Sequence, residues 1–462
     1  MTFAPWSLAY LLPLIAYGCY LAVNRRTVMD PLLIGGGYLA VMFLLHEPYE
    51  QAYATHTLFL FHVLSSAAYW TGGLLAYRRA RAWNSIRTSG CLFVLRRNAW
   101  FWMAVTALVL SGFIFMVTFQ GSVDLMFHMR NRPELMLGSV ISEVSSLERL
   151  AQYFRGYLFA TAAFMIFFWC RRIDRRPTSI ALLLLALFSS AAILAAGGSR
   201  GFILFLGVHC YFALHYALRG KQGMRLVAKI AALACVPIIA LTILTLTLYR
   251  DTGLTEDQQL ELVRDRAIEA TSAILEHVSF NDETQFVLAN YPESYGFTKG
   301  HSLITPFVVF VPRPMWPQKP IPWGRDLAWQ FGYCYETTVS LAATIMGEGY
   351  ANFGLLGWML FPLVFGSAIG WTFHFLKSSR NDFQMLFGLW GVYWALALRG
   401  DYHTVMSAAI FPSLVLIVVL RYLAFKRVTI VPVTVSQAPP RAEAAGGSWG
   451  WTEDCLAGRR LG

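Results

Sequence analysis

Long apolar windows separated by short polar stretches recur along most of this 462-residue chain. A helix needs about 20 predominantly apolar residues to cross the hydrocarbon core of a bilayer, and most of these windows approach that length. The pattern therefore predicts an all-α, polytopic membrane protein with about 11 transmembrane helices. The predicted spans are residues 6–23, 31–45, 56–77, 98–119, 151–170, 177–197, 201–218, 227–248, 355–376, 383–398 and 404–425.

The spacing of these windows divides the chain into four parts. Residues 1–248 hold an N-terminal bundle of about eight spans, and residues 355–427 hold about three more. Between them lies one large loop, 249–354, in which a capping-box pattern and an apolar stripe predict an amphipathic helix beginning near residue 255. The remaining segment, 428–462, ends in a tail rich in Pro, Ala and Gly, so we expect it to be disordered.

Composition and charge also indicate a membrane location. Hydrophobic residues make up 56% of the chain and charged residues 14%, against roughly 25% charged residues in soluble domains. These values exclude a soluble globular enzyme, a disordered chain and a fibrous protein. The net charge of +11 reflects arginines and lysines that fill every second loop. Since basic loops face the cytoplasm, we expect the N-terminus outside and the C-terminus inside. No basic stripe lies on a soluble domain, so nucleic-acid binding is not expected.

The sequence does not indicate a metal site. The seven cysteines are scattered and form no CxxC pair, so neither a zinc site nor a disulfide framework is indicated. No acidic pair and no His/Glu cluster has the spacing of metal ligands. We therefore expect no metal and no other cofactor.

The segment GGSRG, residues 197–201, forms a short turn between two predicted spans on the outer side. Its glycines allow a tight turn, and Ser199 can cap the following helix. That helix would direct its free N–H groups, its positive dipole end and the Arg200 side chain to one place, which describes an anion-binding site. The alternative is a plain hairpin turn whose Arg200 reaches the lipid headgroups.

The segment VPRPMWPQKP, residues 311–320, contains four prolines, which stiffen the backbone and hold Arg313 and Lys319 in place. Arginine offers a bidentate contact to a phosphate, and lysine adds a point charge. Trp316 and Trp323 suit either the membrane interface or stacking on a sugar ring. The alternative is a rigid interfacial loop that binds no substrate.

Two further polar motifs occur at the outer ends of predicted spans. In RGDYH, residues 399–403, Arg399 and Asp401 form either part of a site or a simple salt bridge. In GEGYANFG, residues 347–354, a carboxylate at the membrane boundary is costly unless it is paired or hydrated. That carboxylate, Glu348, fits either a general base or a counter-ion for one of the arginines.

Taken in order, the four motifs resemble those of the Wzy family of oligosaccharide repeat-unit polymerases. The residues that carry the resemblance are GGSRG (197–201), PRPMWPQKP (312–320), GEGYANFGLLG (347–357) and RGD (399–401). The large outer loop before the ninth span matches as well. The resemblance extends over roughly residues 30–425, and the segment 312–320 is its most specific part.

The resemblance implies a glycosyltransferase that polymerises undecaprenyl-diphosphate-linked oligosaccharide repeat units at the periplasmic face of the bacterial inner membrane. The growing chain would pass from its lipid diphosphate to a sugar hydroxyl of the next unit, without a metal, to give O-antigen, capsule or exopolysaccharide. The implied fold is similar to that of the GT-C membrane glycosyltransferases. The implied partners are the lipid-linked oligosaccharides, membrane lipids, and a flippase and a chain-length regulator of the same pathway.

The resemblance also assigns roles to residues. Preorganised arginines would stabilise the charge that develops on the leaving diphosphate. A carboxylate or an imidazole would accept the proton of the attacking hydroxyl, so His301 and His403 compete with Glu348 as the base. The catalytic residues are then Glu348, Arg200, Arg313 and Arg399. The residues expected to bind substrate are Ser199, Lys319, Trp316, Asn352, Asp401, His403 and His301.

Two other functions are open alternatives. A polytopic transporter or exporter of lipid-linked glycan would place polar residues near the membrane midplane, whereas the mid-span regions of this chain are mostly apolar. A ligase of the O-antigen type, which transfers finished glycan to a lipid core or a protein, is separated from a polymerase only by the family motifs.

Overall fold

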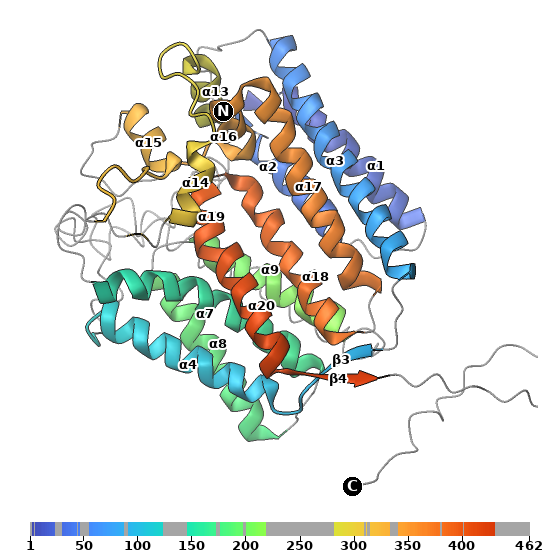
Figure 1. The fold of residues 1–462 in the computed structure, drawn as a ribbon. Coiled ribbons are helices and arrows are strands. Elements are labelled where there is room, and N and C mark those ends of the chain that lie inside the picture. The colour runs from blue at the N-terminus through green and yellow to red at the C-terminus, as the bar shows by residue number, and fades with distance from the viewer. Residues whose placement is uncertain are drawn as a thin grey trace, which may run out of the picture.

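The computed structural model describes residues 2–3, 5–23, 30–43, 45–46, 55–86, 91–122, 146–171, 176–196, 200–218, 281–308, 311, 315–332, 341–378, 381–400 and 402–429. Most of these residues are helical, and the helices gather into one bundle (Figure 1). The predicted helical class is therefore confirmed for the described part of the chain, apart from two short strand pairs.

The N-terminal half contributes both peripheral helices and the buried helix Ser146–Arg171. Its described helices are α1 (Leu8–Val23), α2 (Pro31–Met42), α3 (Thr55–Ile86), α4 (Ala99–Thr118), α7 (Ser146–Arg171), α8 (Pro177–Ala196) and α9 (Arg200–Ala217). A short 3-10 turn, η1 (Pro5–Ser7), precedes α1, and the strands β1 (Thr2–Phe3) and β2 (Leu45–His46) pair antiparallel.

The C-terminal half begins with short helices and continues with long ones. The short helices are α13 (Asn281–Asn290), α14 (His301–Val308), α15 (Trp323–Gln330) and α16 (Thr344–Phe353). After them come α17 (Leu355–Ser378), α18 (Asp382–Leu396), the 3-10 turn η2 (Ala397–Arg399), α19 (Tyr402–Val405), the π-helical segment η3 (Met406–Ile410) and α20 (Phe411–Leu423).

Each predicted span coincides with a helix, except 227–248, which lies outside the described residues. Within the described residues, the helices long and apolar enough to cross a membrane are His56–Ala82, Ala99–Thr118, Pro177–Leu194 and Leu355–Lys377. Three further apolar helices are shorter: Leu8–Val23, Pro31–Met42 and Phe411–Leu423. These helices support a membrane protein, whereas the count of about 11 spans stays a prediction. The predicted helix near residue 255 and most of the tail lie outside the described residues.

Three of the segments predicted to face the cytoplasm meet at one end of the bundle, which we call the basic end; they precede the fourth span, follow the fifth and precede the tenth. Arg171 and Asp382 form an ion pair that joins the last residue of α7 to the first of α18. The second oxygen of Asp382 accepts a hydrogen bond from the backbone amide of Leu95 at 3.1 Å. In Figure 1 the short helices α13 to α16 lie toward the other end, which we call the outer end.

The basic end also carries a strand pair that the hydrophobic pattern did not predict. Strand β3 (Cys91–Leu95) pairs antiparallel with β4 (Phe425–Thr429), so residues at the end of the last predicted span meet residues that precede the fourth. Both strands are rich in Val, Phe and other residues that favour extended backbone. Each strand has only five residues, which is too short to show a clear hydrophobic period in the sequence.

Helices α3 and α17 pack backbone against backbone through small residues. Gly366 and Gly370 lie four residues apart, on one face of α17. A Cβ atom at Gly370 would overlap the backbone of Gly73 in α3, and one at Gly366 would overlap that of Tyr69. Small residues at this spacing let membrane helices approach closely. The two helices run side by side along the bundle (Figure 1).

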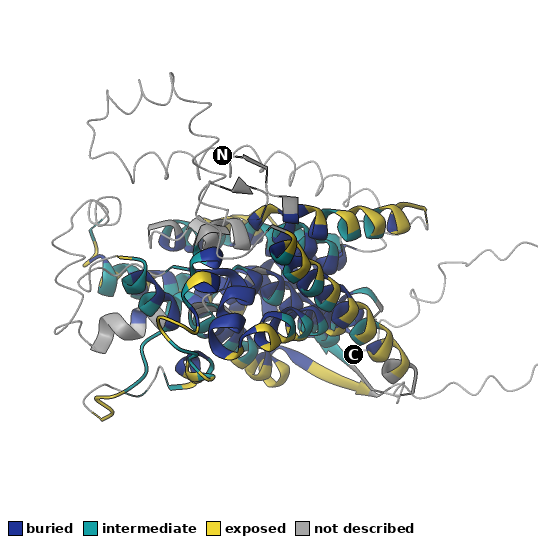
Figure 2. Ribbon diagram, turned by 90° about the horizontal axis from the view of Figure 1, so that it is seen from above, coloured by how far each residue is buried: buried dark blue, intermediate teal, exposed yellow. Residues whose placement is uncertain are grey.

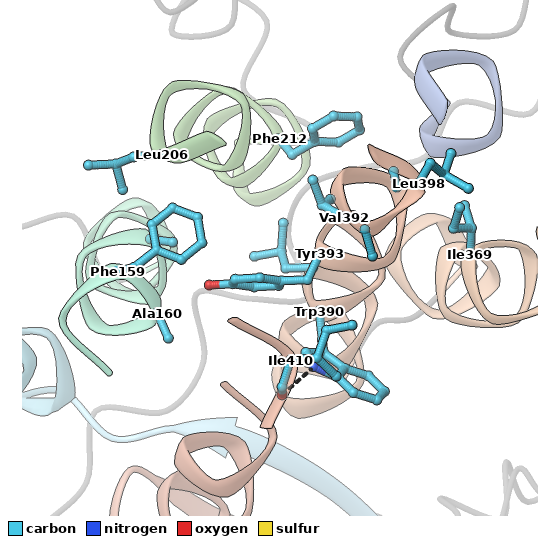
Figure 3. Close-up of a cluster of buried hydrophobic side chains, with 14 of the residues drawn as sticks. Phe159, Ala160, Leu206, Phe212, Ile369, Trp390, Val392, Tyr393, Leu398 and Ile410 are labelled. Atoms are coloured by element: carbon cyan, nitrogen blue, oxygen red, sulfur yellow. Dashed lines mark hydrogen bonds between the residues drawn. The ribbon is translucent and has the colours of Figure 1, made fainter. Parts of the chain in front are cut away.

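The outside of the bundle is apolar as well as its interior. Figure 2 shows exposed positions along the perimeter helices. Large apolar side chains are among the exposed residues, for example Leu12 at 62%, Val109 at 64% and Phe188 at 76% exposure. Such a surface suits contact with lipid. Inside, Phe159 of α7 meets Tyr393 of α18 with ring centres 5.2 Å apart, in a cluster of apolar side chains drawn from several helices (Figure 3).

The predicted orientation can be tested with two exposed positions at opposite ends of the bundle. His301 begins α14 at the outer end, and Lys426 lies on β4 at the basic end. In a cysteine-free background, we expect a membrane-impermeant maleimide to label His301→Cys in intact spheroplasts. Lys426→Cys should be labelled only after the membrane is disrupted. The reverse pattern would overturn the orientation derived from the basic loops.

Candidate functional site

The centre of the candidate site is α16, a helix without an exposed face. All its residues from Thr344 to Asn352 are buried. The helix packs against α13, α17 and η2. The hydroxyl of Thr284 in α13 donates to the carbonyl of Ala343, 3.0 Å away, and so fixes the point where α16 begins. A polar motif that the sequence placed at the membrane boundary is therefore enclosed by protein.

Glu348 lies in the middle of this helix and is only 1% exposed. Its Oε2 atom accepts a hydrogen bond from the backbone amide of Tyr402, with an N–O distance of 2.8 Å. Burial and the nearby charge of Glu348 together raise the pKa of the Tyr402 hydroxyl to about 12. The bond joins residues 54 positions apart. It therefore brings two of the four candidate motifs, 347–354 and 399–403, into direct contact.

Gly400 forms a second contact between the same two motifs. Its backbone has a φ of +96°, which favours glycine. A Cβ atom at this position would stand 2.6 Å from the carbonyl carbon of Thr344, the first residue of α16. Thr344 itself has a φ of +60°, which is unusual for a β-branched residue. Backbone strain of this kind is often retained at functional sites.

Arg399 comes immediately before this contact, at the end of η2. It is partly buried, and its charge acts on the Tyr38 hydroxyl in α2. His403, also partly buried, follows Tyr402, and its carbonyl accepts a 2.6 Å hydrogen bond from the Ser407 hydroxyl in η3. A π-helical segment such as η3 is rare and occurs frequently at functional sites. The structure thus places Glu348, Arg399 and His403 around one short stretch of chain.

The amide of Asn352 is saturated by protein partners. It donates to the Ser302 hydroxyl and to the Glu348 carbonyl, both at 2.8 Å, and accepts from the Thr298 hydroxyl at 2.7 Å and the Gly300 amide at 2.9 Å. These bonds attach the chain around residue 300 to α16. The geometry favours a structural role for Asn352, and its expected contact with substrate stays a prediction.

The proline-rich segment is described only in part. The ammonium of Lys319 donates to the Val311 carbonyl at 3.0 Å, so the segment folds back on itself. Trp316 is 37% exposed and suits an interface or a sugar ring. Trp323 is 2% exposed, so the expectation that it also faces the interface is wrong, because its ring packs inside the protein at the start of α15.

Several predicted site residues lie outside the described residues. They are Ser199, Arg313 and Asp401, together with the side chain of Arg200. The backbone of Arg200 is described, and it begins α9, as the predicted turn requires. His301 is exposed at the start of α14, and its amide donates to the Thr298 carbonyl at 3.0 Å. In the described part of the chain, no group of three His, Cys, Asp or Glu side chains is placed to hold a metal ion.

Sequence reasoning missed the partners that organise this site. The Tyr402 amide, Ser302, Thr298 and Thr284 all bond to α16 or to the residue before it. Of these four, Tyr402 belongs to the motif 399–403, but no pattern indicated its contact with Glu348. A serine or threonine in a loop carries no signal for a contact that forms about 50 residues away. Only Gly400 offered a hint, because a glycine beside charged residues can mark a close approach of backbone.

Comparisons with known proteins give no family for this chain. No protein-family model, no curated protein and no solved structure matches it. The functional argument therefore depends on the residues and their geometry.

The contact between Gly400 and Thr344 can be tested with a matched pair of glycines. Gly400→Ala adds a methyl group both at a positive φ and against backbone, so we expect it to lower the free energy of unfolding by about 2–4 kcal/mol. Gly296 has a φ of +67° but open space around it. Gly296→Ala should therefore cost only about 1–2 kcal/mol. Unfolding of the purified variants in detergent measures both values, and equal losses would contradict the close contact.

Proposed function

We propose that this protein is a membrane glycosyltransferase that polymerises lipid-diphosphate-linked oligosaccharide repeat units, as the resemblance to the Wzy family implies. The proposal includes a bacterial inner-membrane location, a periplasmic outer end, about 11 spans and a fold of the GT-C kind. The observation that carries it is the bond between Glu348 and the Tyr402 amide. Two motifs on which the resemblance depends lie far apart in sequence and meet there.

The proposed reaction forms one glycosidic bond and breaks one bond to phosphate. A hydroxyl oxygen of the acceptor unit attacks the anomeric carbon of the donor chain, and the lipid diphosphate leaves with the bonding electron pair. The hydroxyl proton passes to a base of the protein. Charge develops on the leaving diphosphate, so cationic groups preorganised around it lower the barrier. Arg200, Arg313 and Arg399 are the cations that we assign to this task.

The burial of Glu348 favours a positioning role over that of the base. A general base must come within about 3 Å of the hydroxyl that it deprotonates. Glu348 is almost fully buried, and one of its oxygens is bonded to the Tyr402 amide. In this arrangement it holds the segment that contains Arg399 and His403. We therefore assign Glu348 to positioning that segment and His403, with His301 as the competitor, to accepting the proton.

The remaining assignments follow the resemblance. Trp316 and Lys319 are assigned to the sugar and the phosphate of the lipid-linked unit, together with Ser199 and Asp401. The partners we propose are undecaprenyl-diphosphate-linked oligosaccharides and the surrounding lipids, with a flippase and a chain-length regulator acting in the same pathway. No metal or other cofactor is assigned to the reaction.

The glycan profile of cells tests the proposed reaction. Arg200→Ala and Arg313→Ala should each abolish polymer and leave single-repeat decoration, at unchanged protein abundance. Arg→Lys at either site should restore only part of the polymer, because the bidentate contact is lost. Arg79→Ala, an exposed arginine in α3, is the control and should give a normal profile. Loss of all decoration would indicate a ligase, and normal chain length in both alanine variants would contradict the anion site.

One conservative substitution distinguishes a positioning role of Glu348 from the role of a general base. Glu348→Gln keeps an oxygen that can accept the Tyr402 amide, so a positioning residue should retain at least about a tenth of wild-type turnover, whereas Glu348→Ala should lose it. A base would fail in both variants. Polymerisation by purified protein in liposomes is the measurement, with Glu293→Gln, an exposed outer carboxylate, as the control. Turnover below about a thousandth in Glu348→Gln would restore the base role.

A further inference from the structure

Arg155 is a charged residue in the outer half of α7 that none of the four motifs includes. Its Nε atom is inaccessible to solvent and makes no hydrogen bond to the residues that the structure describes. The contact that the structure gives its guanidinium is an aromatic one, with the carbon 6.0 Å from the centre of the Phe119 ring at the end of α4. Arginine is the side chain best equipped to bind anions, yet here it is held by an aromatic ring inside the bundle.

A second arginine in the same helix shows the contrast. Arg171, the last residue of α7, is paired with Asp382 at the basic end. At a rise of 1.5 Å per residue, Arg155 lies about 24 Å farther along the helix. Arg155 falls inside the span predicted at 151–170, where an ionisable group is costly and marks a functional site by default. Among the described residues Arg155 has no carboxylate partner, whereas Arg171 has one, so its charge is available to an anion that binds there.

The packing of α7 places Arg155 near the candidate site. Arg155 and Phe159 lie four residues apart, on one face of the helix. Phe159 touches Tyr393 of α18 (Figure 3), and one turn closer to the outer end α18 continues into the turn that ends at Arg399. Phe159 also touches α9, whose first residue is Arg200. Arg155, Arg399 and the backbone of Arg200 therefore all lie toward the outer end from Phe159.

We propose that Arg155 binds the phosphate groups of the lipid-linked substrate within the outer half of the bundle. The inference depends on the proposed function, because it names a further residue for the same substrate. The planar guanidinium can hold two phosphate oxygens at once, and a site shielded from water strengthens that contact. A polyprenyl tail remains in lipid, so its diphosphate reaches an arginine at this depth without leaving the membrane. Arg155 would then hold the leaving group together with Arg399 and Arg200, the arginines already assigned to the same diphosphate.

The test separates binding from folding. Purified wild-type protein and Arg155→Met are placed in phosphatidylcholine nanodiscs, and thermal unfolding is followed during titration with undecaprenyl diphosphate. Methionine fills similar volume against Phe119 without charge. Arg155→Met should unfold at the same temperature as the wild type or higher without ligand, and should bind the diphosphate at least about tenfold more weakly. Arg176→Met, an exposed arginine at the start of α8, should bind like the wild type.

Two further ligands identify the source of the phosphate. Inorganic pyrophosphate should bind the wild type more weakly than the lipid does, and equal binding would place the site in contact with free phosphate and overturn a lipid-linked ligand. Undecaprenol, which lacks phosphate, should not distinguish wild type from Arg155→Met. If it distinguishes them as strongly as the diphosphate does, Arg155 acts on lipid packing and the proposal is wrong.

The remaining outcomes separate this inference from the function on which it depends. Equal affinity of wild type and Arg155→Met for undecaprenyl diphosphate overturns the role of Arg155 and leaves the proposed function standing. Wild-type protein that does not bind the diphosphate contradicts the proposed function as well. Failure of both Arg155→Met and Arg155→Gln to fold assigns the arginine to structure and also overturns the proposal.

Discussion

A carboxylate enclosed by helices sets the constraint on which the outer half of this protein depends. Removing an ion from water costs several kcal/mol even after relaxation, so Glu348 requires a compensating donor. The Tyr402 amide is one such donor, and a hydrogen bond to a charged group contributes about 1.5–3 kcal/mol. Because this donor belongs to the backbone, the bond specifies where the chain after Arg399 runs. Because η3 and α20 follow Tyr402 in the chain, the place where Tyr402 is fixed also determines where they begin.

The pairing of α3 with α17 makes this arrangement possible. Close backbone contact at Gly366 and Gly370 holds the two long helices together without large side chains between them. Helix α16 is separated from α17 by Gly354 alone, so it is attached directly to the end of this pair. The Asn352 amide then ties the chain around residue 300 to the same helix. A rigid pair of membrane helices thus supports a buried polar helix at one end of the bundle.

The hydrophobic pattern was sufficient to predict the long helices, but it did not predict the contacts of the candidate site. Windows of about 20 apolar residues have a direct physical cause in the bilayer, and helices occur at each of them that the structure describes. The strands β3 and β4 were not predicted, because five residues show too little periodicity. Trp323 was misplaced because a tryptophan beside prolines suits an interface and a packed interior equally well. The bond from Tyr402 to Glu348 could not be predicted, since it involves a backbone amide 54 residues away.

The contrast within α7 shows how a membrane protein treats charge for stability and for binding. Arg171 has a carboxylate partner at the end of its helix, where water and headgroups also help. Arg155 lies inside the predicted span, near its outer end, where an arginine costs less than the roughly 2.5–3.5 kcal/mol of a central one on insertion scales. The cation–π contact with Phe119 returns roughly 0.5–2 kcal/mol, but the buried Nε has no hydrogen bond to the described residues, and this leaves a deficit in the folded protein without ligand. A bound phosphate would remove that deficit, and part of its affinity would then come from charge that the empty protein leaves incompletely compensated. Stability in the empty state and affinity for an anion therefore oppose each other at Arg155, as they do wherever a binding site is built from preorganised charge.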